Sequence, residues 1–157
     1  MKQPPHLTLN LASPEDARLI ALMSRELIEA GLPWTWTPER VARNLHHPET
    51  LVLTARDAHH LAGFAIMQFG EERAHLSLLA VRPDCQRLGI GRRMLHWLTE
   101  SALTAGIVSV HLELRESNAS ARRFYLAQGF TETVRIPNYY SGVETAVRML
   151  REIGIKA

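Results

Sequence analysis

The sequence predicts an α+β fold, in which helices flank one mixed β-sheet in the order βααβββαβαββ. Three observations lead to this class. Several short stretches alternate apolar and polar residues, as strands with one buried face do. Residues typical of helix starts precede longer amphipathic stretches, and glycines follow those stretches. The 157 residues, 46% of them hydrophobic, suit one domain (residues 1–157) with a sizeable core.

The N-terminal part of the chain predicts one strand and two helices. Leucines alternate with other residues over positions 7–12, which favours a strand. Residues 13–16 (SPED) supply a capping hydroxyl, a first-turn proline and early acids, so a helix is expected as far as Ala30. The same signal returns in residues 37–39 (TPE), and this second helix is expected to end near residues 46–48.

The rest of the chain predicts six strands and two helices. Apolar runs and alternation indicate the strands, and amphipathic stretches that end at glycine indicate the helices. The expected strands are Thr50–Arg56, Leu61–Phe69, Ala74–Val81, Val108–Leu114, Phe130–Ile136 and Val143–Arg151. The expected helices run from Gly91 to about Ala105, and from a cap at Asn118 to Gln128-Gly129.

The loop of residues 86–91 (QRLGIG) joins an apolar strand directly to an amphipathic helix. Gly89 and Gly91 have no Cβ, so the backbone can approach a ligand closely and adopt positive φ. The first N–H groups of a helix lack intrahelical partners, and with the helix dipole they favour an anion. Arg87, Arg92 and Arg93 add positive charge. The loop predicts a pyrophosphate cradle, with an ordinary strand-to-helix turn as the alternative.

Asn118 and Tyr125 are seven residues apart, which is two helical turns, so both are expected on one helix face. A phenol has a pKa of about 10 and is protonated at neutral pH. Tyr125 is therefore a candidate general acid, with a packed ring beside Phe124 as the alternative.

The strand before this helix carries a carboxylate. His111, Glu113 and Arg115 are expected on one of its faces, and two leucines on the other. Glu113 is either a base, acting directly or through water, or an ion-pair partner of Arg115 or of a neighbouring arginine. His111 and His75 are second-line candidates for the base.

The stretches LAVRPDCQRLGIGRRML and HLELRESNASARRFYLAQGF resemble the GNAT family of acetyl-coenzyme A-dependent N-acetyltransferases. The resemblance implies the acyl-CoA N-acyltransferase fold, with acetyl-CoA as co-substrate. It implies that the N–H of Val81 faces the thioester oxygen. It implies cofactor contacts from Leu79, Ala80, Val81, Gln86, Arg87, Leu88, Gly89, Ile90, Gly91, Arg92, Asn118, Ala121 and Tyr125.

The C-terminal half, with its RIPNYY and AVRM segments, is similar to the bacterial ribosomal-protein N-terminal alanine acetyltransferases. This similarity implies that Glu113 is the base and Tyr125 the acid, and that Asn138, Tyr139 and Tyr140 lie near the acceptor. Before residue 70 the similarity weakens. There Trp34-Thr35-Trp36 replaces a single tryptophan after proline, so Trp34 and Trp36 either line an acceptor pocket or attach the loop to the sheet.

An N-acetyltransferase that works by direct attack in a ternary complex is therefore expected. Its first-choice acceptor is a protein or peptide α-amino group. The alternatives are a small amine (a polyamine, amino acid or antibiotic) and an acyl-CoA-binding module without catalysis. The single cysteine, Cys85, excludes an internal disulfide and is not expected to act as a nucleophile.

Composition and spacing limit the other partners. The formal charge of +2 gives no reason to expect a nucleic acid. The pairs His46-His47 and His59-His60 lack the spacing of metal ligands, so no metal site is expected. There is no secretory signal and no run near the ~20 apolar residues of a membrane span. A cytoplasmic protein is expected, and a homodimer is left open.

Overall fold

The computed structural model describes residues 7–58 and 60–154. Its helices are α1 (Ala17–Leu27), α2 (Pro38–His46), α3 (Ile90–Thr104) and α4 (Ala119–Ala127). Its strands are β1 (Thr8–Leu11), β2 (Thr50–Arg56), β3 (Leu61–Phe69), β4 (Arg73–Val81), β5 (Ser109–Arg115), β6 (Thr131–Tyr140) and β7 (Glu144–Glu152). The predicted order βααβββαβαββ is confirmed. His59, which the sequence predicts in a turn, lies outside the described residues.

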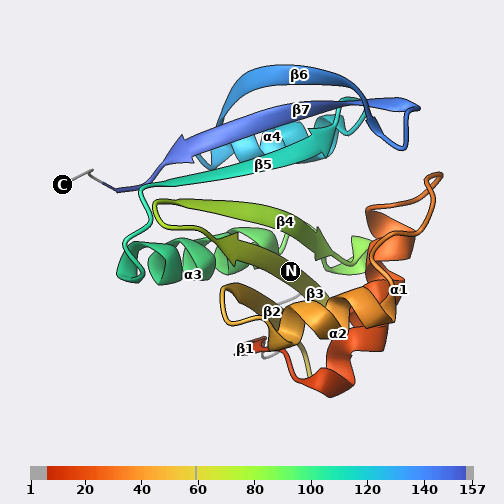
Figure 1. Cartoon of the computed structure of the whole chain (residues 1–157). Coiled ribbons are helices and arrows are strands. Elements are labelled where there is room, and N and C mark those ends of the chain that lie inside the picture. Colours follow the sequence, from red (N-terminus) through yellow and green to blue (C-terminus); the bar gives the residue numbers. More distant parts are fainter. Residues whose placement is uncertain (1–6, 59, 155–157) are drawn as a thin grey trace.

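The strands form one mixed sheet in the order β1-β2-β3-β4-β5-β7-β6. All neighbouring strands are antiparallel except β4 and β5, which run parallel. Helices cover both faces of the sheet, with α1 and α2 on one face and α3 and α4 on the other (Figure 1). Successive side chains of a strand point to opposite faces, so the central strands supply residues to two apolar cores.

The two cores differ in extent. One lies under α3 and α4 and reaches Leu112, Leu114 and Tyr125. The other lies under α1 and α2, and in the described part of the chain its strand residues come from β2, β3 and β4 only. Because Leu112 and Leu114 face α4, the residues between them face the other way. The α1–α2 face of β5 therefore carries polar side chains, Glu113 among them.

The parallel pair β4 and β5 separates after three residue pairs. The strands are in register at Arg73↔Ser109, Ala74↔Val110 and His75↔His111 only, although β4 continues to Val81 and β5 to Arg115. On its other edge β4 contains one extra residue, Ser77, because Ile66 of β3 faces Leu78 while Met67 faces Leu76. A bulge of this kind bends its strand, and Figure 1 shows β4 and β5 diverging from their shared end.

Two elements differ from the predicted bounds by several residues, while others differ by about one residue at an end. The first helix is shorter, because residues 14–16 form a separate 3₁₀ turn and α1 ends at Leu27 instead of Ala30. The Ser13 N–H donates to Asp16 Oδ2 at 2.8 Å, which stabilises that turn. The strand predicted to end at Ile136 continues as β6 to Tyr140, with an irregularity at Asn138, whose φ is +58°.

Candidate active site

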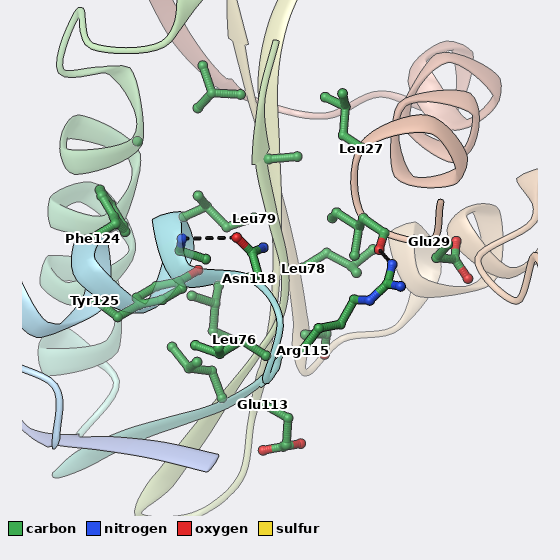
Figure 2. A pocket seen from close by; sticks show the side chains of 18 of the residues that line it. Leu27, Glu29, Leu76, Leu78, Leu79, Glu113, Arg115, Asn118, Phe124 and Tyr125 are labelled. Atoms are coloured by element: carbon green, nitrogen blue, oxygen red, sulfur yellow. Dashed lines mark hydrogen bonds between the residues drawn. The ribbon is translucent and has the colours of Figure 1, made fainter. Parts of the chain in front are cut away.

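The gap between β4 and β5 opens into a cleft of about 940 Å³. Most of its wall residues come from the segment after α1, β4, the loop before α3 and the first turn of α3, β5, α4 and the β6–β7 hairpin. Figure 2 shows Tyr125 and Phe124 on the α4 side of this cleft and Glu29 on the α1 side. Because β4 and β5 pair no further than His75 and His111, the backbone groups beyond this point on both edges of the cleft have no strand partner. An extended ligand can hydrogen-bond to such edges.

The predicted cradle forms one end of the cleft. Gly89 is the N-cap of α3 and has φ +79°, and Arg87 also has a positive φ of 66°. Among the described residues, the backbone N–H groups of positions 87–89 donate to no protein acceptor. Gln86 Nε2 donates to the Val81 carbonyl at 3.1 Å, which ties the loop to the end of β4. The arrangement leaves N–H groups and the positive end of α3 available to an anion.

Gly91, in the first turn of α3, lies against α4. A Cβ built on Gly91 would lie 3.4 Å from two ring atoms of Phe124 and 3.7 Å from Val81 Cγ2. These are ordinary van der Waals distances, so packing alone does not require a glycine at this position. Gly89 has only Arg92 Nη2 within 4 Å of such a Cβ, at 3.8 Å, so backbone conformation and not space is what Gly89 provides.

Helix α4 presents two of the predicted residues to the cleft. Asn118 is its N-cap, and Asn118 Oδ1 accepts from the Ala121 N–H at 3.1 Å, as Figure 2 shows. Tyr125 is 7% exposed, and its ring packs edge-on against Phe124 and Phe130. Within the described residues no hydrogen bond holds the Tyr125 hydroxyl, which points to the cleft in Figure 2. Burial raises the pKa of Tyr125 above its usual range, so the phenol stays protonated.

Glu113 lies on the opposite face of the sheet from Tyr125. Its Oε1 is 2.9 Å from His75 Nε2 and accepts from the Tyr139 hydroxyl at 3.1 Å, and its Oε2 accepts from Arg148 Nε at 3.3 Å. Burial alone would raise the pKa of Glu113, but these hydrogen bonds and the nearby charge lower it to about 2. Burial, and then the charge of Glu113, raise the pKa of Tyr139. At neutral pH the site thus holds a carboxylate and a protonated phenol.

The ion pair expected as the alternative for Glu113 is present, but with a neighbouring arginine and not with Arg115. The partner is Arg148, which faces Glu113 across the β5–β7 pairing. Arg115 instead donates from Nε to Glu144 at 2.6 Å and from Nη1 to the Ala30 carbonyl at 2.6 Å. Arg115 therefore joins the segment after α1 to the β6–β7 hairpin at one end of the cleft.

The tryptophan loop is held by a buried carboxylate. Glu29, 7% exposed, accepts from the Thr35 N–H at 2.7 Å and from the Trp36 N–H at 3.2 Å. Trp36 lines the cleft, with the guanidinium of Arg40 3.9 Å from its ring centroid. Trp34 does not line it, because its Nε1 donates to the Ala21 carbonyl at 3.2 Å and its ring packs with the α1–α2 core.

Most of the other predicted residues line the same cleft. The lining includes Leu79, Ala80, Val81, Gln86, Arg87, Gly89, Ile90, Gly91, Arg92, Asn118, Ala121, Tyr139 and Tyr140. It does not include Leu88 or Asn138. Cys85 lies beside the cradle, where burial raises its pKa and keeps the thiol protonated. In the part of the chain that the structure describes, no helix is long and apolar enough to cross a membrane.

The sequence did not indicate which residues contact Glu113, beyond a neighbouring arginine, nor did it indicate the role of Glu29. His75 appeared there only as an independent base, and Arg148 only as part of a strand. One signal could have identified Arg148. Oppositely charged residues often face each other on paired strands, and Glu113 faces Arg148 when β5 pairs with β7. Nothing in the local sequence indicates that Glu29 accepts hydrogen bonds from a loop six residues further on.

The comparisons with known proteins agree with this geometry. Residues 19–130 match the acetyltransferase (GNAT) family. A segment of 108 residues is 42% identical to the ribosomal protein bS18-alanine N-acetyltransferase of Salmonella typhimurium and spans 67% of this chain and 72% of that protein. The enzyme of the same name from Escherichia coli K12 is 39% identical over 98 residues, 60% of this chain and 66% of that protein.

The fold is similar over a longer stretch. The crystal structure of the ribosomal-protein-S18-alanine N-acetyltransferase from Escherichia coli superposes with a TM-score of 0.83 and 29% identity, covering 96% of each chain. The cradle, the parted strands and the cleft with Tyr125 and Glu113 are thus found in a chain whose sequence and fold both match one family. The protein belongs to the acetyltransferase (GNAT) family and is an N-acetyltransferase that uses acetyl-CoA.

Proposed function

We propose that this enzyme acetylates the N-terminal α-amino group of a protein that begins with alanine, with the ribosomal protein bS18 as the first candidate. Its relatives of that specificity are 42% and 39% identical over their matched segments. The observation that carries the proposal is the position of Glu113 and Tyr125, which line one cleft from opposite faces of the sheet. A ribosomal acceptor also implies a cytoplasmic location.

The two faces divide the chemistry. In the proposal, the pyrophosphate of acetyl-CoA lies on the cradle and the thioester enters the gap between β4 and β5 from the α4 side. The acceptor amine reaches the carbonyl carbon from the side of Glu113. The C–S bond then breaks, and Tyr125 donates its proton to the leaving sulfur. The Tyr125 hydroxyl has no hydrogen-bond partner among the described residues, and its raised pKa keeps it protonated at the start of the reaction.

Glu113 acts mainly by its charge. Its pKa of about 2 lies far below the 7.7–8.0 of an α-amino group, so direct proton capture from the ammonium is unfavourable. The carboxylate instead attracts the amine and stabilises the positive charge that develops on nitrogen during attack. The proton leaves through water that contacts Glu113. An α-amino group needs less help than a lysine side chain, whose pKa is about 10.4.

The charges that line the cleft favour an acceptor with a single amine. The lining has two carboxylates, Glu29 and Glu113, and Glu29 already accepts hydrogen bonds from Thr35 and Trp36. It also carries four arginines, Arg40, Arg87, Arg92 and Arg115. The several ammonium groups of a polyamine would be repelled by these arginines, and Glu113 is the one lining carboxylate left to bind an ammonium group. An extended peptide, by contrast, can use the unpaired edges of β4 and β5.

A panel of acceptors tests the proposal. Thiol release from acetyl-CoA is measured with a peptide of the bS18 N-terminus that begins with alanine, the same peptide with its α-amine blocked, spermidine and free alanine. The expected kcat/KM for the open peptide exceeds that for each other acceptor by at least about 100-fold. Equal rates with the blocked peptide, or a higher kcat/KM for spermidine, would reject an α-amino acceptor.

A further inference from the structure

We propose that His75, His111 and Glu113 form a Zn²⁺ site, and that the bound ion inhibits the enzyme reversibly. One ligand atom from each of the three side chains lies within 4.8 Å of the others. The two imidazoles are stacked, with ring centroids 4.7 Å apart. Two histidines and a carboxylate are a known ligand set for zinc with an open fourth position.

The backbone fixes the relative positions of the three ligands. His75 and His111 face each other at the last paired position of β4 and β5, and Glu113 follows two residues along β5. All three belong to one sheet, so their Cα atoms are held without help from a loop. Tetrahedral bonds of 2.0–2.1 Å require ligand atoms about 3.3 Å apart. His75 Nε2 and Glu113 Oε1 are already 2.9 Å apart, so the remaining separations, which are at most 4.8 Å, must close by rotation of the side chains.

The surroundings of the cluster support the ligands. Ser77 Oγ lies 3.3 Å from His75 Nδ1, and the Tyr139 hydroxyl donates to Glu113 Oε1 at 3.1 Å. Partners of this kind orient metal ligands. Arg148 and Arg73 are the positive charges that oppose a cation here. Arg148 donates to Oε2 of Glu113 and leaves Oε1 on the side of His75. His75 and Glu113 line the cleft, so an ion and the water that completes its coordination can reach them from there.

The ligand types select the ion. Imidazole nitrogen suits Zn²⁺, whereas Mg²⁺ and Ca²⁺ prefer oxygen ligands and here would find only one protein carboxylate. Zinc on Glu113 would neutralise the charge that receives the acceptor amine and would occupy the space beside it. Inhibition therefore rests on the proposed function of Glu113, but binding of the ion does not.

Calorimetry with Zn²⁺ alone tests the site without any reaction. His111→Gln is the main variant and His75→Gln the second, because the two remove one ligand each from different strands. The matched control is His96→Gln, since His96 is an exposed histidine on α3 outside the cluster. We expect each ligand variant to lose at least about tenfold in Zn²⁺ affinity, the control to bind as the wild type does, and Mg²⁺ not to bind.

Initial rates with and without Zn²⁺, at saturating acetyl-CoA, test the inhibition. Each variant's rate is divided by its own rate in the presence of a chelator, so a change in basal activity does not enter. Zinc is expected to inhibit the wild type and His96→Gln at concentrations that leave His111→Gln active, and the chelator is expected to restore the wild-type rate.

Equal Zn²⁺ affinity in the wild type and both ligand variants would overturn the site. Tight binding without inhibition would overturn the inhibitory role. If no peptide is acetylated even with chelator, the proposed function fails, while calorimetry still decides on the site.

Discussion

The Tyr125 hydroxyl is the smallest group on which the proposed chemistry depends. It has no hydrogen-bond partner among the described residues, while its ring is held by Phe124 and Phe130. Tyr125→Phe should therefore keep the packing and the affinity for acetyl-CoA. The loss should fall on kcat, by about 10²-fold or more at neutral pH, because only the proton donor is removed.

Single-turnover kinetics and calorimetry on the Tyr125→Phe protein measure both quantities. A thermal unfolding curve serves as the control for folding, since a hydroxyl without a protein partner contributes little to stability. A variant with the wild-type kcat would exclude Tyr125 as the acid.

Glu113 links the same site to stability at low pH. Its pKa is about 2 in the folded chain and about 4.3 when unfolded, so its ionised form stabilises the fold above about pH 4.3, and this contribution is lost as the pH falls toward 2. The full contribution is of order 3 kcal/mol, and about 2 kcal/mol of it is lost between about pH 6 and pH 3.

Urea unfolding of the wild type and of Glu113→Gln at these two pH values measures that difference. The wild type should lose more unfolding free energy on acidification than the variant does, by about 2 kcal/mol. Parallel losses in the two proteins would mean that the carboxylate is not held as the hydrogen bonds from His75 and Arg148 indicate.

At the scale of elements, the start of α3 depends on a left-handed residue. Gly89 and Gly106 flank this helix with φ of +79° and +83°, and neither has a close atom that would block a methyl group. Alanine at either position should cost about 1–2 kcal/mol of backbone strain. Only Gly89 lies in the cleft, so Gly89→Ala should also weaken acetyl-CoA binding, while Gly106→Ala should not.

Calorimetric titration with acetyl-CoA measures the affinity of the two variants, whose substituted positions have nearly the same φ and therefore similar backbone strain. Equal affinities in Gly89→Ala and Gly106→Ala would show that the conformation at residue 89 is not needed for the cradle.

The elements themselves could be predicted well because their signals are local. Each signal lies within a few consecutive residues: the TPE helix start at 37–39, the alternation along 74–81 and the glycine loop at 86–91. The bulge at Ser77 could not be predicted in this way, because it depends on the pairing of β4 with β3.

The same distinction holds for the site. Tyr125 and Glu113 could be identified by their positions on a helix face and a strand face. The contacts of Glu113 with His75, Tyr139 and Arg148 join three different strands, so they follow from sheet order and not from spacing. Trp34 and Trp36 are two residues apart, yet only Trp36 lines the cleft.

At the scale of the whole molecule, Arg115 links the segment after α1 to the β6–β7 hairpin across the gap between β4 and β5. It contacts Glu144 of the β6–β7 hairpin and the carbonyl of Ala30, and its side chain is 25% exposed. Arg115→Met should raise the KM for the peptide about tenfold, corresponding to about 1.4 kcal/mol, because both walls of the acceptor end lose their common anchor. The Kd for acetyl-CoA should change little.

The control for Arg115 is Arg135→Met. Arg135 pairs with Glu116 on the same sheet, but its side chain is 58% exposed, and such pairs contribute about 0–1 kcal/mol. A KM unchanged in Arg115→Met, or raised equally in both variants, would show that the Arg115 link does not position the acceptor.

The central claim is that the acceptor is an α-amino group that attacks acetyl-CoA from the Glu113 side of the sheet. Tandem mass spectrometry on one peptide, with an N-terminal alanine and an internal lysine, tests it most directly, because both amines are then present at the same concentration. The enzyme is expected to add one acetyl group, on the alanine nitrogen, and Glu113→Gln is expected to slow that product selectively. Acetylation of the lysine in preference to the alanine, or of both at equal rates, would contradict the account.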